Sequence, residues 1–181
     1  AVDEGTRYNH NAYLKFTSKE LFRHTDFEVA VFGSSLYTIF DFRKANPAQP
    51  RWEETSGQSA IKDRKFGLRA QFSSHLIFSD NVFTRLVYGY DYLLDKTAQP
   101  LVDGRLWMPW LTSNNHAPFI QTKTTLWQYV NIKIGGRYDF INVSVPDYDV
   151  LRNKLSDPQV RVKGGSLHYN NFSFNMGLSY N

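Results

Sequence analysis

Cysteine is absent from the 181 residues of this chain. Its absence excludes disulfide bonds, thiol nucleophiles and metal sites built from thiolates. No stretch of the sequence approaches 18 consecutive apolar residues, so a transmembrane helix is excluded as well. The chain begins with alanine rather than methionine, and residues 1–6 lack the charged-then-apolar order of a signal peptide. We therefore expect an internal segment or a processed start.

Catalytic signatures are also missing. The sequence has no H-E-x-x-H, no G-x-S-x-G and no phosphate-binding glycine loop. Asp147 and Asp149, near Asp139, lack the regular ligand series of a calcium-binding loop. The five histidines show no ligand-like spacing: His10, His24, His75, His116 and His168. We expect a chain that is not an enzyme and has neither a cofactor nor a metal site of its own.

Clustered positive charge is a further absence. The chain has 21 Lys and Arg against 17 Asp and Glu, a net charge of +4, and these residues are scattered along it. A nucleic-acid-binding surface concentrates its Lys and Arg on one element or one face. We expect no nucleic-acid partner.

Aromatic residues, in contrast, are abundant. They make up 16% of the chain, with 14 Phe and 11 Tyr, while the mean hydropathy is −0.47. Many aromatics on a polar average are typical of strands that show one face to an apolar medium and the other to water. A soluble sheet protein with aromatic strands has the same composition, so composition leaves both possibilities open.

Alternation with a period of two recurs along the chain, whereas helical periodicity is scarce. Between positions 65 and 78 the even residues are mostly apolar, from Phe66 to Phe78, and the odd ones are mostly polar or charged, from Lys65 to His75. A β-bulge is expected at residues 33–35, because Glu28 and Asp41 otherwise have opposite parity. The pattern predicts an all-β fold, an antiparallel up-and-down meander of about seven long strands over residues 8–17, 27–42, 65–78, 83–95, 118–126, 130–141 and 172–180.

The expected connections alternate in length. Short ones cover residues 18–25, 79–82 and 127–129, and long ones cover residues 43–64, 96–116 and 142–170. Outer-membrane barrels have short periplasmic turns and long extracellular loops, whereas a sandwich requires no strict alternation. This alternation favours a section of a transmembrane β-barrel.

The ionisable residues predict which side of the sheet meets lipid. Each keeps to the polar parity of its strand, and a Lys or Arg on the lipid face costs roughly 2–4 kcal/mol at the bilayer midplane. The apolar parity is therefore expected to face lipid and the polar parity to face the lumen. The predicted lumen-facing residues are Arg69, Gln71, Arg85, Lys133 and Arg137. The open alternative is a soluble β-sandwich, in which Leu68, Phe72, Tyr88 and Ile134 pack against a second sheet.

Three segments together suggest a family. Gly135, Gly136, Arg137, Tyr138 and Asp139 follow a G-x-RYD pattern, and residues 172–180 read FSFNMGLSY. Residues 89–110 read GYDYLLDKTAQPLVDGRLWMPW. In order and spacing these segments resemble strands of TonB-dependent receptors of the siderophore type, best over residues 64–181. Phe174 stands where the family's FSPxxGLxY strand usually has proline.

The resemblance implies a 22-stranded transmembrane β-barrel with a plugged lumen, of which this chain supplies about a third. Residues 1–181 are thus expected to be a partial TonB-dependent receptor β-barrel domain. The sequence contains no plug domain, no TonB-binding box and no terminal aromatic strand, so plug and closing strands are expected outside it. The implied function is part of active uptake of a ferric siderophore or similar large nutrient across the outer membrane of a Gram-negative bacterium. The implied partners are outer-membrane lipid, the ferric siderophore, and the TonB–ExbB–ExbD complex acting through the plug.

Six residues of the expected extracellular loops are candidates for binding an iron chelate. Loop aromatics can pack on a ligand, and Arg105 can pair with an anion through its bidentate fork. The candidates are Trp52, Arg105, Trp107, Trp110, Tyr148 and Tyr169. The alternative is that these residues cap the loops and pack on one another. A passive porin-like or structural barrel remains a further possibility for the whole.

Overall fold

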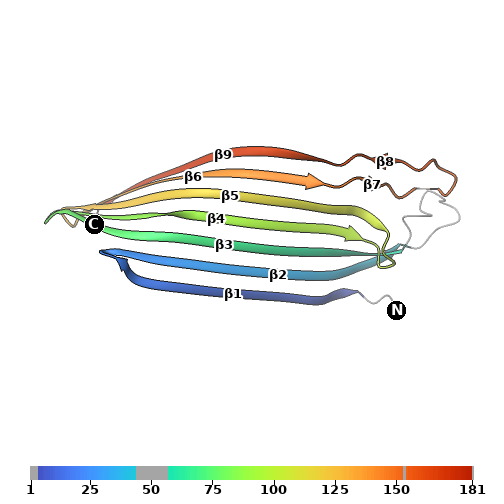
Figure 1. The fold of residues 1–181 in the computed structure, drawn as a ribbon, viewed down its shortest axis with the longest axis horizontal. Coiled ribbons are helices and arrows are strands. Elements are labelled where there is room, and N and C mark those ends of the chain that lie inside the picture. The colour runs from blue at the N-terminus through green and yellow to red at the C-terminus, as the bar shows by residue number, and fades with distance from the viewer. Residues whose placement is uncertain (1–3, 44–56, 153, 181) are drawn as a thin grey trace.

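The computed structural model describes residues 4–43, 57–152 and 154–180. Their long strands form one antiparallel sheet in the order β1-β2-β3-β4-β5-β6-β9. Its strands are β1 Gly5–Phe22, β2 Thr25–Arg43, β3 Gly57–Ser79, β4 Val82–Pro100, β5 Leu106–Leu126, β6 Val130–Val145 and β9 Gly165–Tyr180. Each strand pairs with the strand next to it in the chain, apart from the two short strands β7 and β8 (Figure 1). The predicted seven-stranded antiparallel meander is confirmed.

The connections at the two ends of the sheet differ in length. Residues 23–24, 80–81 and 127–129 join strands at one end (Figure 1). Residues 44–56, which lie outside the described ranges, and residues 101–105 and 146–164 join them at the other. The last of these contains a small ribbon, in which β7 Tyr148–Asp149 pairs with β8 Arg161–Val162. The expected alternation of short and longer connections is present.

The strands are longer than the alternation predicted. The expected loop over residues 96–116 is wrong, because β4 continues to Pro100 and β5 begins at Leu106. Pairs such as Lys96 with Thr112 extend the ladder through this region although the strict alternation of apolar and polar residues has ended. Backbone hydrogen bonds do not depend on side-chain hydropathy, so the ladder continues where the apolar alternation stops.

The predicted bulge lies further along β2. Pairing between β2 and β3 is continuous through residues 33–35 and shifts between Ile39 and Phe42. There three steps along β2, from Ile39 to Phe42, match two along β3, from Ala60 to Gln58. One extra residue of β2 is accommodated at that point, as a β-bulge requires. The side chain of Asp41 lies outside the described part of the structure.

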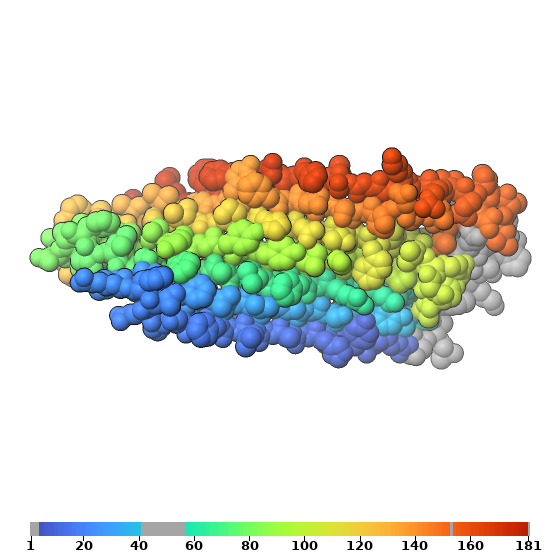
Figure 2. Space-filling view, in the orientation of Figure 1, coloured from blue at the N-terminus to red at the C-terminus, as the bar shows by residue number. Residues whose placement is uncertain are grey.

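The sheet is open and lacks a second layer within the described ranges. β1 and β9 are its two edge strands, and the buried apolar residues are few and mostly alanine. Ile134 is 55% exposed and Met176 is 80% exposed. Figure 2 shows the strands as successive stripes of side chains across one face. The second sheet that a soluble sandwich needs is not found among the described residues.

Candidate functional site

The predicted ligand-binding residues are not gathered in loops. Trp107 and Trp110 belong to β5 and Tyr169 belongs to β9, so the loop assignment of these three was wrong. Tyr148 lies in β7, inside the connection between β6 and β9. Trp52 lies outside the described residues. The alternation stops before these strands end, which is why their outer parts were assigned to loops.

Arg105 is held within a tight turn formed by residues 101–105. Its Nε and Nη2 donate to Asp103 Oδ2 at 2.9 and 2.6 Å, and its backbone N–H donates to Asp103 Oδ1 at 3.0 Å. These hydrogen bonds from Arg105 lower the pKa of Asp103. Gly104 adopts a φ of 98°, which a side chain would strain. The guanidinium group of Arg105 therefore stabilises the turn. This is the alternative stated from the sequence, in which the candidate residues cap the loops.

The five predicted lumen-facing residues share one face of the sheet, named here the polar face. Strand register aligns Arg69 with Asp91, and Phe119 with Arg137. Gln71 faces Glu28 at 3.4 Å, and Glu28 also pairs with Lys15 at 2.6 Å. The common face follows from the period of two, because register keeps the parity of all strands aligned.

A network of ion pairs lies at the centre of the polar face. Arg69 donates two hydrogen bonds to Asp91, at 2.6 and 2.7 Å, and Arg137 from β6 also donates to Asp91. Arg137 donates to Asp139 at 3.0 Å, and Asn115 donates to the same carboxylate at 2.8 Å. Two arginines and two aspartates thus neutralise one another across strands β3 to β6.

The predicted motif around Arg137 supplies half of this network. Arg137 and Asp139 lie on the polar face, and Tyr138 between them points to the opposite face, where its ring lies 4.7 Å from that of Phe140. The guanidinium of Arg69 lies 5.5 Å from the centre of the Phe119 ring. A hollow of about 370 Å³ opens beside the network, lined by Tyr13, Glu28, Phe32, Arg69, Asp91 and Arg137 among others.

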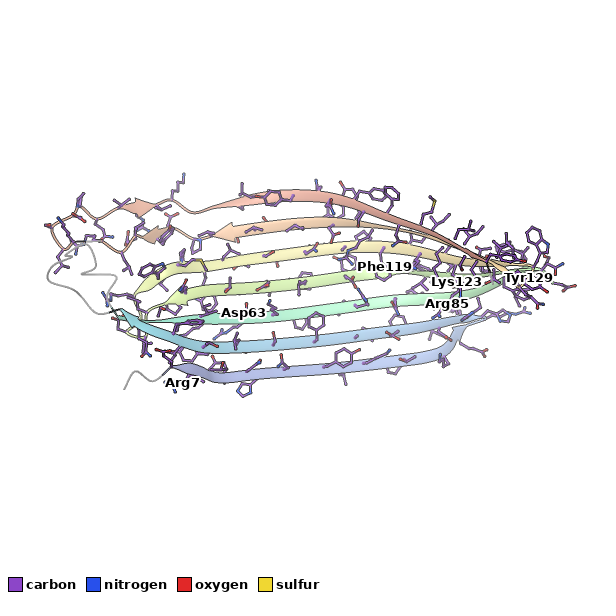
Figure 3. All side chains as sticks on the ribbon, turned by 180° about the vertical axis from the view of Figure 1, so that it is seen from behind. Arg7, Asp63, Arg85, Phe119, Lys123 and Tyr129 are labelled. Atoms are coloured by element: carbon purple, nitrogen blue, oxygen red, sulfur yellow. The ribbon has the colours of Figure 1, made fainter. Side chains whose placement is uncertain are left out.

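A row of three cations crosses the polar face nearer the short turns. Arg85 of β4 lies directly opposite Lys123 of β5, which lies directly opposite Lys133 of β6. Figure 3 labels Arg85 and Lys123 side by side, towards the end where Tyr129 lies. Arg85 Nε donates to Ser73 Oγ at 2.8 Å, and within the described ranges no carboxylate pairs with any of the three. Like charges placed directly opposite repel, so this row attracts anions.

Lys123 was missed by the sequence prediction, as were Asp91 and Asp139 as members of a site. Their parity was visible, but their partners depend on register between strands. The signal that would have found the row is the length of the 127–129 connection, which places Lys123 opposite Lys133 once the hairpin is closed.

The opposite face carries an apolar band with a sharp polar boundary. One row of paired residues across the seven strands is polar throughout: His10, Ser35, Arg64, Lys96, Thr112, Ser144 and Ser166. From this polar row towards the short turns the face becomes apolar. At the boundary, Tyr92 donates to Asn114 Oδ1 at 3.0 Å and Tyr90 contacts His116 Nδ1.

The apolar band runs obliquely to the strands. In β3 it begins two residues from the polar row, at Phe66; in β6 it begins four residues away, at Phe140; in β9 it begins six residues away, at Phe172. Towards the short turns the apolar residues extend six positions from the polar row in β1, to Phe16, and fourteen positions in β3 and β6, to Phe78 and Val130.

The drift of the boundary gives the angle between strands and band. From β3 to β9 it amounts to about one residue per strand, or roughly 3.3 Å along the chain for each 4.8 Å across the sheet. The strands therefore cross the band at about 35° from its normal. The band covers nine residues of β9, from Phe172 to Tyr180, and eleven of β6, from Val130 to Phe140, so with this tilt its height in these strands is about 25–30 Å.

The chain matches no known protein-family model. Among the described residues, no helix is long and apolar enough to cross a membrane. The same residues contain no group of three His, Asp or Glu side chains placed to hold a metal ion.

Proposed function

We propose that this chain is a section of the wall of a transmembrane β-barrel in the outer membrane of a Gram-negative bacterium. In this proposal the apolar band contacts lipid, and the polar face lines the interior of the barrel. The barrel serves active uptake of a large anionic nutrient, such as a ferric siderophore.

The observation that carries the proposal is the oblique apolar band. Barrel strands in outer membranes tilt by 35–45° and carry an outward apolar band about 25 Å tall. The band of this sheet has about that height, and the strands cross it at about that angle. A soluble sheet has no reason to shift the start of its apolar face by about one residue per strand from β3 to β9.

The ends of the sheet support one orientation in the membrane. Short turns face the periplasm and longer connections face the outside in outer-membrane barrels. Residues 23–24, 80–81 and 127–129 are then periplasmic. The strands continue beyond the apolar band at the opposite end, so that part of the sheet projects from the outer surface.

The polar face supports an anionic cargo. The central network of Arg69, Asp91, Arg137 and Asp139 is neutral, whereas the row of Arg85, Lys123 and Lys133 is not. Rows of Lys and Arg favour anions in pores. The resemblance to TonB-dependent receptors suggests the energy source, namely the TonB–ExbB–ExbD complex acting through a plug domain. A ferric siderophore fits this combination of charge and energy source.

Single-cysteine labelling tests the membrane placement. Because the chain has no native cysteine, each label is attached at the introduced position. Cysteine at Tyr88 or Ile132 carries a spin label on the apolar face, and cysteine at Val87 or Asn131 carries one on the polar face. In the full-length protein in bilayers, we expect the first pair to be accessible to oxygen and the second to a water-soluble nickel complex.

The period of two in accessibility is the decisive readout. Protection of Tyr88 and Ile132 positions from both reagents would mean that another protein layer covers the apolar face. Equal exposure of all four positions to the nickel complex would mean that the sheet lies in water. Either outcome overturns the proposal.

A further inference from the structure

Three cations lie at the border of the apolar band. They are on the face of the sheet that carries this band, called the outward face below. Arg64 of β3 and Lys96 of β4 are directly opposite one another in the polar row, and both are exposed. Lys62 lies two residues beyond Arg64 on the same face of β3. The next residues towards the short turns are Phe66 and Leu94, which begin the band. We name Lys62, Arg64 and Lys96 the outer cation cluster.

The outer cation cluster lacks acidic partners. Lys65, the neighbour of Arg64 on the polar face, pairs with Asp63 and Asp95 at 3.6 and 3.3 Å. On the outward face, within the described part of the chain, no carboxylate pairs with a member of the cluster. Like charges directly opposite in a sheet destabilise it unless an anion lies between them.

Aromatic rings hold two of these cations in place. The ammonium of Lys62 lies 5.2 Å from the centre of the Tyr37 ring, and the guanidinium of Arg64 lies 5.7 Å from that of Trp110. Arg64 of β3 thus contacts a ring of β5, two strands away. Cation–π contacts fix the position of a charge without neutralising it. The cluster is thus ordered and still free to bind an anion.

We propose that the outer cation cluster binds the phosphate groups of an anionic lipid headgroup. This inference rests on the proposed membrane placement and adds a specific lipid partner to it. Arg64 and Lys62 lie two and four residues from Phe66, and Lys96 lies two residues from Leu94, which is about the depth of headgroup phosphates above the acyl chains. A lipid whose phosphates pair with Arg64 and Lys96 lays its chains on the aromatic surface below. The outer leaflet at this end offers phosphorylated glycolipid.

Lipid retention by the full-length protein tests this assignment. Native mass spectrometry of protein exchanged into detergent with lipid A and phosphatidylcholine counts the bound molecules of each. The variant Lys62→Gln/Arg64→Gln/Lys96→Gln removes the cluster. Each Lys or Arg near a membrane surface contributes about fivefold to the binding of anionic lipid, so the triple variant should bind lipid A about 100-fold more weakly. Binding of phosphatidylcholine should not change.

The matched control is Arg85→Gln/Lys123→Gln/Lys133→Gln, which removes the same charge from the polar face. It should retain lipid A as the parent protein does. Equal loss in both triple variants would mean that net charge, not the cluster, binds the lipid, and would overturn the inference. Displacement of lipid A by millimolar inorganic phosphate would overturn it too, because it would make the cluster a site for the free ion. If the spin labels show the apolar face in water, the proposed function is wrong. If they show it in lipid and the cluster variant still binds lipid A, the proposed function stands and only this inference is wrong.

Discussion

The ring of Phe32 occupies the space where a side chain at Gly67 would be. The two residues are directly opposite on β2 and β3, and a Cβ atom added to Gly67 would lie 2.0 Å from Phe32 Cζ. Gly67→Ala must therefore displace the ring. Overpacking of this kind costs about 1–3 kcal/mol. We expect a lower urea midpoint for unfolding of the full-length protein from lipid vesicles.

The sign of the effect should reverse when the ring is removed. In a Phe32→Ala background the space is open, and Gly67→Ala should be neutral or stabilising, because alanine loses less chain entropy than glycine in a strand. Gly177 serves as a single control, since an added Cβ there meets nothing within 4 Å. An equal cost of Gly67→Ala with and without the ring would refute the steric explanation.

Asp91 holds the two arginines of the central network together. Its side chain is 14% exposed and accepts hydrogen bonds from both Arg69 and Arg137. Asp91→Asn keeps the shape but leaves two guanidinium groups to repel one another. We expect the free energy of unfolding to fall by about 1–2 kcal/mol, less than for a fully buried pair, because both arginines reach solvent. The same urea titration measures it.

Asp80→Asn is the control for the loss of a negative charge, because Asp80 lies in a hairpin turn away from the network. It should leave the urea midpoint unchanged at the same ionic strength. Should Asp80→Asn and Asp91→Asn lower the midpoint equally, the network contributes nothing beyond net charge.

The faces of individual residues were predictable, and their partners were not. Parity alone placed Arg69, Arg85 and Lys133 on one face, because a strand repeats every two residues. Arg137 meets Asp91 across β5, from a strand that is not its neighbour. That contact depends on two registers and on long side chains, neither of which a single sequence states.

At the scale of elements, the strands themselves were predictable but their outer ends were not. The apolar alternation covers only the part of each strand inside the apolar band. In β4 it ends at Leu94, yet the ladder continues to Pro100. Beyond Leu94 neither face of β4 continues the apolar alternation, so the sequence there resembles a loop while the backbone remains paired.

The β5–β6 hairpin gives a prediction at this scale. Trp127 and Gln128 have φ angles of 48° and 66°, as in a type I′ turn, and the N–H of Tyr129 donates to the carbonyl of Leu126 at 3.1 Å. Glycine adopts such angles without the steric cost that glutamine incurs. Gln128→Gly should raise the free energy of unfolding by about 1 kcal/mol and slow hydrogen exchange at Tyr129.

A glycine placed inside a strand should act in the opposite direction. Gln121 belongs to β5 and pairs with Val87 and Gly135. Gln121→Gly should lower the free energy of unfolding by roughly 0.5–1 kcal/mol, because glycine loses more chain entropy there. If Gln128→Gly also destabilises the protein, the positive φ at that position carries no strain.

At the scale of the whole molecule, two independent patterns agree. Connection lengths predicted an up-and-down meander, and register then aligned the apolar residues into one oblique band. The slope of the band could not be predicted from the sequence, because it appears only when the registers of neighbouring strands are added together. Each of the edge strands β1 and β9 has one unpaired edge in this sheet.

The cation row on the polar face leads to the last prediction, which concerns transport. If Arg85, Lys123 and Lys133 line the passage, their positive potential raises the local concentration of an anionic chelate. Arg85→Gln/Lys123→Gln/Lys133→Gln should then reduce energised uptake of an anionic ferric chelate by about tenfold at low salt, with less effect on a neutral chelate. Raising the ionic strength should reduce the difference between variant and parent, because screening weakens the potential of exposed charges. If the variant loses uptake of both chelates equally, at every salt concentration, the three cations contribute to the stability of the barrel wall and not to recognition of the chelate.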